Sequence, residues 1–312
     1  MKALVGYTGF VGGNLAASAD FDGLYNSKNI EEAFGTKPDI LYYAGVPAEK
    51  YIANKFPEED EKIVRNAMDN IRKIDPKLLV LISTVDVYRD PFRATEETMA
   101  AGQGTYGKNR RLLECYVEDY FPDSLIVRLP GLFGKGIKKN FIFDYIRYIP
   151  ALLNEQKFAG LSARREELKE YYVLNDKGFY ACRAEEPKAR AVLREIFEDL
   201  GFSALHFTDS RAIYQFYDLS DLYGDIGRAI DAGLSLLNMA TEPVSAGEVY
   251  QYLTGETFIN EITEDPVHYD MRTIHYEMLG GIQAEDEKSG YLYRKDDILQ
   301  RIKTFTEKEI TL

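Results

Sequence analysis

The segment TYGKNRRLLE, residues 105–114, places a tyrosine one helical turn before an arginine. Residues four apart share a helix face and residues two apart do not, so Tyr106 should face Arg110 while Lys108 points elsewhere. A tyrosine with its ordinary pKa of about 10 needs help to act as an acid or base near neutral pH. Because a cation about 4 Å away could lower that pKa by up to ~3, the pair predicts proton transfer by Tyr106.

A second group of residues that could bind a ligand is the glycine-rich turn GYTGFVGG, which follows the apolar run of residues 1–5. A strand, a tight turn and a helix opening at glycines allow the backbone to approach a pyrophosphate, whose charge the helix N-terminus stabilises. An ordinary glycine-rich turn is the alternative, because a glycine triplet alone is a weak signal. The cofactor contacts predicted in this turn are Gly6, Thr8, Gly9, Phe10, Val11 and Gly12.

The segment GLYNSKNI occupies the place where a dinucleotide site usually has an acidic residue for the adenosine ribose. It offers Asn26, Ser27 and Lys28 instead, and these neutral and basic groups would tolerate a 2′-phosphate. This composition favours NADP(H) over NAD(H), without excluding either. Asn29 followed by Glu32 would also make a capping box, so a purely structural role for the segment stays open.

These residues need a sheet to position them, and short uninterrupted apolar runs supply its strands at residues 1–5, 40–45, 78–83 and 125–131. Charged helical segments at 58–74 and 106–121 separate the runs, so the predicted fold is α/β, a Rossmann-type doubly wound parallel sheet. Ligands of such sheets gather at the carboxyl ends of the strands. The residues expected there, besides the glycine turn, are Ala44, Gly45, Val46, Ser83, Thr84 and Pro130.

The rest of the chain predicts a second, discontinuous part. Residues 161–202 are rich in charge, have helical periodicity and show no alternation of strands and helices, so they are expected to form an insertion outside the sheet. The strand-like run 213–219 and a helical stretch to about residue 237 are expected to return to the sheet. The predicted domains are therefore 1–150 with 213–242 for the dinucleotide, and 151–212 with 243–312, a smaller mixed α/β part, for the substrate.

Composition narrows the functions further. A net charge of −13 and a pI near 4.9 argue against binding nucleic acid or an anionic membrane. No apolar run approaches the roughly 18 residues of a membrane span, and no leader-like segment is evident, so a cytoplasmic protein is expected. The two cysteines do not suggest a disulfide framework. The three histidines lack ligand spacing, so no metal site is expected.

Taken in order, GYTGFVG, DILYYAG, LISTVDVY, TYGKNRRLLE and VRLPGLFG resemble the extended short-chain dehydrogenase/reductase family, the NAD-dependent epimerases, dehydratases and reductases of nucleotide sugars. VPAEKYIANKFPEED looks somewhat like the dTDP-4-dehydrorhamnose reductase branch. LNMATEPVSAGEVYQYL and YDMRTIHYEMLG resemble later parts of the family. The likeness covers residues 1 to about 145 and about 213 to 280.

The resemblance implies roles for particular residues. Tyr106 matches the catalytic tyrosine, Thr84 its hydroxyl partner and Glu114 an acidic position on the same helix, while Asn140 matches a substrate-side asparagine. Arg110 stands where the family has a lysine. Its guanidinium keeps the positive charge and could bind the nicotinamide ribose, but it cannot relay a proton, which would have to travel through water or ribose hydroxyls.

Two functions remain open. The first is an NAD(P)-dependent oxidoreductase or epimerase acting on a nucleotide-activated sugar, with Tyr106 as general acid/base. Arg211 and Arg272 could contact the diphosphate because arginine binds phosphate oxygens in pairs, although Arg211 also suits a structural role. The second is a catalytically impaired NAD(P)-binding protein that acts as a sensor or assembly subunit. A homodimer is expected from the family resemblance alone.

Overall fold

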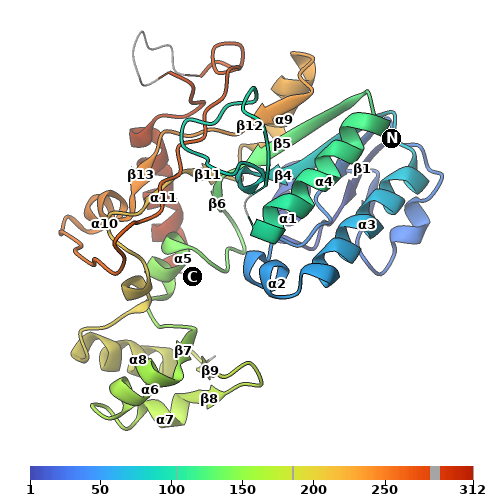
Figure 1. The fold of residues 1–312 in the computed structure, drawn as a ribbon. Coiled ribbons are helices and arrows are strands. Elements are labelled where there is room, and N and C mark those ends of the chain that lie inside the picture. Colours follow the sequence, from blue (N-terminus) through green and yellow to red (C-terminus); the bar gives the residue numbers. More distant parts are fainter. Residues whose placement is uncertain (103, 185, 282–288, 312) are drawn as a thin grey trace. The chain divides into compact units, whose positions relative to one another are not determined.

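The computed structural model describes residues 1–102, 104–184, 186–281 and 289–311 of the 312-residue chain (Figure 1). The chain divides into two compact units. The first comprises Met1–Ile137, Ile213–Ser245 and Val267–Ile302, and the second Lys138–Ala212, Ala246–Pro266 and Lys303–Leu312. Residues 267–302 thus belong with the first unit, whereas the predicted substrate domain included them. The functional roles assigned to the predicted domains stay predictions.

A parallel sheet organises the first unit. Its strands among the described residues follow the order β12-β5-β4-β3-β1-β2, and every neighbouring pair is parallel. The strands are β1 (Lys2–Val5), β2 (Gly23–Tyr25), β3 (Ile40–Tyr43), β4 (Leu78–Thr84), β5 (Ser124–Leu129) and β12 (Leu236–Asn238). The apolar runs predicted as strands become β1, β3, β4 and β5, so the Rossmann-type α/β fold is confirmed.

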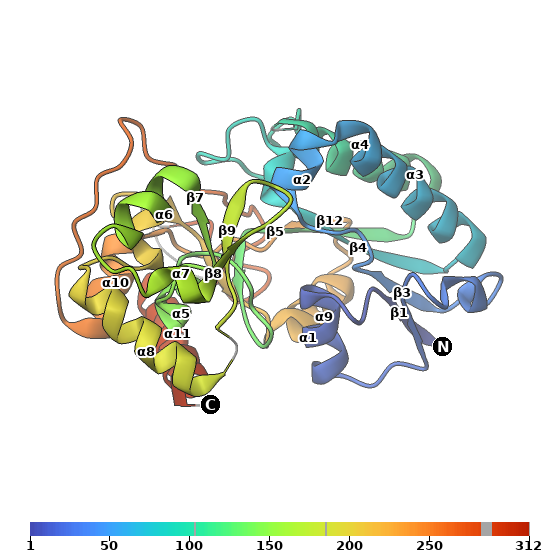
Figure 2. The same ribbon diagram turned by 90° about the horizontal axis from the view of Figure 1, so that it is seen from below.

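Helices cover both faces of this sheet, α3 and α4 on one and α1 and α9 on the other (Figure 2). Each face has its own hydrophobic core. Leu15 of α1 and Ile226 of α9 belong to one core, and Val64 of α3 and Val117 of α4 to the other. The helices of this unit are α1 (Phe10–Ser18), α2 (Lys50–Lys55), α3 (Pro57–Ile74), α4 (Gly104–Tyr120) and α9 (Leu222–Asp231), and α11 (Lys295–Thr311) begins in it.

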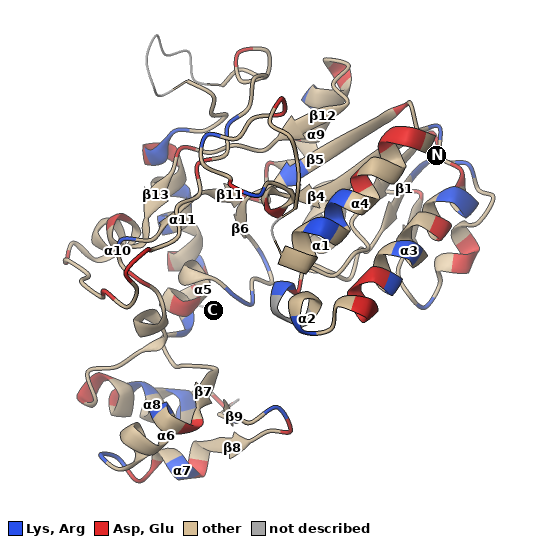
Figure 3. Cartoon of the chain, viewed as in Figure 1, with Lys and Arg blue, Asp and Glu red and all other residues tan. Residues whose placement is uncertain are grey.

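The sequence of α3 explains its position. Pro57 stands in its first turn, acidic residues follow, and Asp75 ends the helix in the left-handed conformation. Val64, Ala67 and Ile71 recur at helical spacing and are buried against the sheet. In Figure 3, Lys and Arg alternate with Asp and Glu along the outer faces of α3 and α4.

Two short edge strands are absent from the prediction. The helix expected to run to about residue 237 ends at Asp231, and after Gly233, with φ of +69°, the chain forms β12 beside β5. The strand β2 lies beside β1 at the opposite edge. Each has only three residues, too few to show a periodic pattern.

The run at residues 213–219 does not return to the main sheet, so that prediction is wrong. Instead β10 (Ile213–Tyr214) pairs with β13 (Val244–Ser245), and β11 (Phe216–Asp218) pairs with β6 (Gly131–Phe133). Between them the buried Gln215 side chain donates to the carbonyl oxygens of Thr241 and Met271 and accepts from the Met271 amide. These bonds satisfy buried backbone groups and fix the run against neighbouring loops instead of beside a strand of the main sheet.

The second unit is built around a small antiparallel sheet, β7 (Leu152–Asn154), β9 (Phe179–Cys182) and β8 (Tyr172–Leu174). Residues 161–202 lie outside the main sheet as expected, but they are not helical throughout, because β8 and β9 form a hairpin. Its turn is stabilised by Asn175, whose side-chain oxygen accepts from the amides of Lys177 and Phe179. Helices α5 (Phe141–Arg147), α6 (Glu155–Ser162), α7 (Leu168–Tyr171), α8 (Pro187–Asp199) and α10 (Ala246–Thr254) complete the unit.

No helix in the described part of the chain is both long and apolar enough to cross a bilayer.

Candidate active site

The glycine turn closes tightly on the end of β3. Gly6 has φ of +92°, and a Cβ atom there would lie 2.4 Å from the carbonyl oxygen of Ala44. A Cβ atom on Gly12 would lie 2.1 Å from the carbonyl oxygen of Gly6. Gly9 is the N-cap of α1 and supplies no side-chain acceptor to the first amides of that helix. The backbone can therefore approach an anionic ligand at the start of α1.

The segment predicted to face the adenosine ribose follows β2, next to this turn. The Gly6 amide donates to the carbonyl oxygen of Tyr25, the last residue of β2. The Asn29 side chain accepts from the Asn26 amide, and no side-chain bond caps the short helical segment after Asn29, so the capping-box interpretation is wrong. Ser27 and Lys28 are exposed at the tip of the turn.

The residues predicted to contact the cofactor after β3, β4 and β5 differ in their surroundings. Gly45 closely approaches β1, because a Cβ atom there would lie 2.9 Å from a methyl of Val5. Ser83 is buried, and its hydroxyl donates to the Glu114 carboxylate at 2.5 Å. Ser83 thus holds α4 against the sheet. The other predicted contacts, Ala44, Val46 and Pro130, lie at or next to these strand ends.

Tyr106 and Thr84 are brought together by the packing of α4 against the end of β4. Tyr106 lies in the first turn of α4 and is 6% exposed, and hydrogen bonding with Thr84 contributes to its pKa. Next to it, a Cβ atom on Gly107 would lie 1.9 Å from the Asp86 carbonyl oxygen. The Asp86 amide donates in turn to the Thr84 hydroxyl at 3.3 Å. The first turn of α4 therefore rests directly on the loop after β4.

Arg110 faces Tyr106 as the spacing predicts, with its guanidinium 4.4 Å from the centre of the tyrosine ring. It is 4% exposed, and it binds both carboxylate oxygens of Asp60 in α3, at 2.9 and 3.1 Å. It also donates to the carbonyl oxygen of Pro47 at 2.8 Å. The charge of Arg110 is therefore largely balanced by Asp60, and its donors are largely engaged within the protein.

The pKa of Tyr106 is raised above its usual value of 10.0. Burial is the largest cause, because it disfavours the phenolate, and the charge of Asp86 acts in the same direction. Arg110, through its charge and hydrogen bonding, and Thr84, through hydrogen bonding, lower the pKa without overcoming burial. The expectation that Arg110 would leave Tyr106 with a lowered pKa is therefore wrong for the protein alone.

The prediction missed two charged residues in the segments that pack against the start of α4. Asp86 lies in the segment Val85–Val87 after β4, and Lys50 in α2 binds its carboxylate at 2.7 Å. The Tyr269 hydroxyl lies 3.5 Å from the same carboxylate. A carboxylate two residues after a strand end was a usable signal for Asp86. Nothing local to the sequence signals Lys50, because only the fold brings α2 to this loop.

Below the site, Glu114 is fully buried and pairs with Arg128 of β5 at 2.7 and 3.0 Å. Arg128 also donates to the Tyr88 hydroxyl at 2.7 Å. Glu114 is one turn after Arg110, so α4 carries two buried ion pairs on successive turns, one to α3 and one to the sheet. These bonds fix the position of the helix that carries Tyr106.

The three predicted substrate residues make intramolecular contacts. Asn140 caps α5, accepting from the amides of Ile142 and Phe143. Arg211 binds Asp209 through two nitrogens and donates to the Thr263 carbonyl. Arg272 pairs with Asp270 at 3.3 Å. Asn140 and Arg211 belong to the second unit and Arg272 to the first, and their role toward a substrate stays a prediction.

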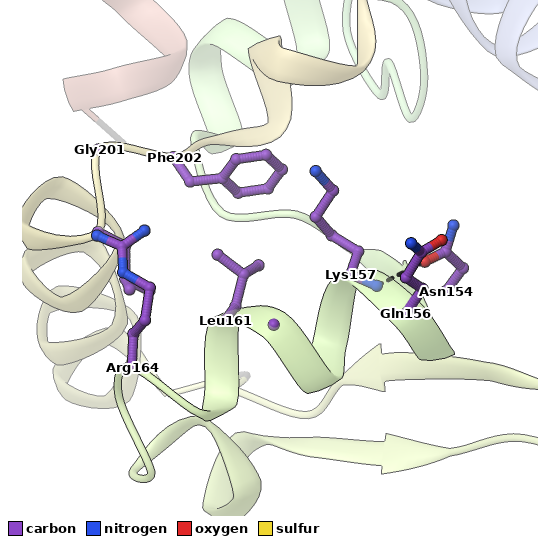
Figure 4. Close-up of a pocket in the computed structure, with 9 residues that line it drawn as sticks. Asn154, Gln156, Lys157, Leu161, Arg164, Gly201 and Phe202 are labelled. Atoms are coloured by element: carbon purple, nitrogen blue, oxygen red, sulfur yellow. Dashed lines mark hydrogen bonds between the residues drawn. The ribbon is translucent and has the colours of Figure 1, made fainter.

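A pocket of about 460 Å³ lies within the second unit, between α6 and the residues after α8 (Figure 4). The Lys157 ammonium lies 4.9 Å from the centre of the Phe202 ring, and Arg164 stands at the pocket's other end. Among the residues lining it there is no acid or tyrosine, so it lacks the proton-transfer groups of the site around Tyr106.

No family model and no curated protein sequence matches the chain. Solved structures match it over nearly its whole length. The dTDP-4-dehydrorhamnose reductase of Bacillus anthracis str. Ames, in complex with NADP, is 16% identical with a TM-score of 0.61, and 99% of each chain is covered. TunA, an NAD-dependent NDP-hexosamine 5,6-dehydratase of tunicamycin biosynthesis, is 12% identical with a TM-score of 0.60, over 98% of this chain and 96% of its own.

The enzyme WbmG of Bordetella bronchiseptica, in complex with NAD and UDP, is 14% identical with a TM-score of 0.60, over 99% of this chain and 94% of its own. At such identities the likeness is one of fold. The comparisons thus confirm the Rossmann-type fold, and they confirm at the level of the fold the resemblance to extended short-chain dehydrogenases/reductases.

Proposed function

We propose that this protein is an NAD(P)-dependent oxidoreductase or epimerase that acts on a nucleotide-activated sugar, with Tyr106 as general acid/base. The observation that carries the proposal is the adjacency of Tyr106 and Thr84 at the end of β4, in a sheet whose β1 leads into the glycine turn. The structural neighbours support the same kind of function. One is a reductase in complex with NADP, one is an NAD-dependent dehydratase, and one is an enzyme in complex with NAD and UDP.

The residues of the chain divide the work as follows. The glycine turn and the first amides of α1 hold the pyrophosphate of the cofactor, which supplies or accepts the hydride when bound. The Thr84 hydroxyl hydrogen-bonds the reacting oxygen of the sugar. The Tyr106 hydroxyl gives its proton to that oxygen in the reducing direction and takes it back in the oxidising direction, with Arg110 stabilising the phenolate through its position over the ring.

NADP(H) is the proposed cofactor of choice, with NAD(H) as the competitor. The support is the composition of the turn after β2, where Ser27 and Lys28 are exposed and residues 26–29 include no carboxylate. Titrating the protein with NADPH and NADH gives both dissociation constants. Tighter binding of NADPH, with a preference that Lys28→Glu reverses, is expected; tighter binding of NADH by the unaltered protein would refute the preference.

The activity is tested with purified protein, reduced and oxidised cofactor, and a panel of UDP-, GDP-, CDP- and dTDP-sugars. Absorbance of the reduced nicotinamide reports net oxidation or reduction, and mass spectrometry with chromatography of the sugars detects a balanced epimerisation. Tyr106→Phe is expected to reduce turnover about 10²- to 10⁴-fold while cofactor binding is retained. Tyr269→Phe is the matched loss of a phenol hydroxyl nearby, expected to act far more weakly.

A second function has an observation in its favour. Arg110 is engaged by Asp60, and burial raises the pKa of Tyr106, as would suit a cofactor-binding sensor or assembly subunit that has lost its chemistry. Such a protein would bind cofactor, leave every sugar of the panel unchanged and be insensitive to Tyr106→Phe. Sugar-dependent turnover that Tyr106→Phe abolishes would eliminate it.

A further inference from the structure

Three separate elements converge on Asp86, next to the proposed catalytic tyrosine. Thr84 at the end of β4 accepts from its amide, and the first turn of α4 touches its carbonyl oxygen at Gly107. On its other side the Lys50 ammonium binds its carboxylate at 2.7 Å. Gly107 directly follows Tyr106, so Asp86 lies against the turn of α4 that carries the phenol. The charge of the Asp86 carboxylate raises the pKa of Tyr106.

The position of Lys50 is fixed by the helix that carries it. Lys50 and Asn54 are four residues apart in α2 and therefore share a face. The Asn54 side chain accepts a hydrogen bond from the Tyr106 backbone amide at 3.0 Å. The helix face that holds the start of α4 thus also presents the Lys50 ammonium to Asp86.

The two cations near Tyr106 differ in how they are held. Arg110 is bound by Asp60, buried, and permanently charged. Lys50 has a side chain 40% exposed, and its partner Asp86 is 12% exposed. Burial lowers the pKa of Lys50, but the hydrogen bond and charge of Asp86 outweigh burial and raise it, so Lys50 is an ammonium at neutral pH.

We infer that Lys50, acting through Asp86, is a second cation that, beside Arg110, favours the ionised form of the Tyr106 hydroxyl. Lys50 is a positioning residue in this inference: it neutralises the carboxylate that would otherwise repel a phenolate. A lysine in a different helix thereby adds to the electrostatic role of Arg110, which is itself paired with Asp60. The inference rests on the proposed function for its biological meaning, although its physical test needs no substrate.

Charged and titratable groups from several elements surround Tyr106 and Asp86. Tyr106 is faced by Arg110 from its own helix and by Asp86 from the loop after β4, and Arg110 is faced by Asp60 from α3. Tyr269 approaches both Asp86 and Lys50. Substitutions at Lys50 and Asp86 leave the pair of Arg110 and Asp60 in place. Changes at Lys50 and Asp86 therefore isolate the effect.

The test follows ionisation of Tyr106 in the full-length protein labelled with ¹³C at tyrosine Cζ, with the signal assigned by its loss in Tyr106→Phe. Lys50→Met is expected to reduce the phenolate fraction at a fixed alkaline pH roughly 3- to 10-fold, because Asp86 is left uncompensated. Lys50→Arg should keep it within about twofold. Asp86→Asn alone should increase it.

The control is Lys55→Met, which removes the same charge from the same helix and should change the fraction less than twofold. Circular dichroism and denaturant unfolding check that each variant folds. The decisive comparison is Lys50→Met in the Asp86→Asn background, where its effect should largely disappear. An unchanged phenolate fraction in Lys50→Met, or an equal decrease with and without Asp86, would overturn the inference.

The same variants separate this inference from the proposed function. If Tyr106 titrates as expected but no nucleotide sugar is converted, only the proposed function fails. If turnover is found and depends on Tyr106, yet its pH profile in Lys50→Met coincides with that of the unaltered protein, only the role of Lys50 fails. Agreement of both requires an alkaline displacement of the pH profile in Lys50→Met that is absent from Lys50→Arg.

Discussion

Two ion pairs flank the proposed catalytic tyrosine, and they are of opposite kinds. Arg110 and Asp60 are both buried, and their bond is doubled and supported by a backbone carbonyl. Lys50 and Asp86 are partly exposed and share one short contact. A buried pair cannot be dismantled cheaply, because either charge left alone in the interior is costly. The difference indicates that the first pair fixes the position of α4, whereas the second can adjust the charge near the phenol.

The largest effect is expected on removing the acid of the buried pair. Asp60→Ala leaves the Arg110 guanidinium without its carboxylate and should lower the free energy of unfolding by about 3–5 kcal/mol. Denaturant titration measures this loss. Asp69→Ala in the same helix is the matched control, because its pair with Arg72 is exposed and should contribute at most about 1 kcal/mol. Equal losses in the two variants would contradict the structural role of the buried pair.

A half-buried carboxylate in α5, whose pKa shift is caused by burial alone, sharpens the comparison. Burial raises the pKa of Asp144 in α5 from 3.8 to about 7. Because the folded pKa lies above the unfolded one, its contribution to stability is present below about pH 4 and is lost as pH rises to about 7. Asp144→Asn should therefore stabilise the protein by up to about 4 kcal/mol at pH 8 and change little at pH 4. Unfolding curves at both pH values check this, and an equal effect at both would contradict it.

A smaller effect is expected when Arg110 becomes lysine. Arg110→Lys keeps a cation near Tyr106 but loses the paired geometry toward Asp60, so the free energy of unfolding should fall by about 1–2 kcal/mol. Turnover of a substrate found in the panel should be unchanged or faster, because an ammonium is able to pass on a proton. Complete loss of turnover with cofactor binding intact would show that the guanidinium has a dedicated role.

The smallest change in stability is expected at the exposed pair. Lys50→Ala should lower the free energy of unfolding by less than about 1 kcal/mol, since a partly exposed pair contributes little and is screened by salt. Unfolding at low and high ionic strength provides the measurement. A loss as large as that of Asp60→Ala would mean that Lys50 holds the fold together, and the contrast between the two pairs would fail.

The parts of this arrangement that follow from local pattern were predictable. The strands β1, β3, β4 and β5 are continuous apolar runs, and the approach of Arg110 to Tyr106 follows from helical spacing. What could not be predicted depends on segments distant in the chain. Asp60 reaches Arg110 across two packed helices, and Lys50 reaches Asp86 only because α2 is held against α4.

Burial was the other quantity that the sequence did not reveal. From the residue types alone, a tyrosine beside an arginine is expected to be activated. In the structure the same tyrosine is nearly enclosed, and the loss of water around its hydroxyl outweighs the neighbouring charge. Ser83 likewise ends a strand as predicted, yet its hydroxyl bonds to Glu114 inside the protein.

The contact between Gly107 and Asp86 has a consequence for how this site tolerates change. With 1.9 Å between a Cβ atom on Gly107 and the Asp86 carbonyl oxygen, even a methyl group would wedge the helix away from the loop and carry the neighbouring phenol with it. The absence of a Cβ atom at Gly107 therefore determines how closely the turn that carries Tyr106 packs against the loop after β4. A Cβ atom at position 107 would meet backbone, which cannot move aside as the end of a flexible side chain can.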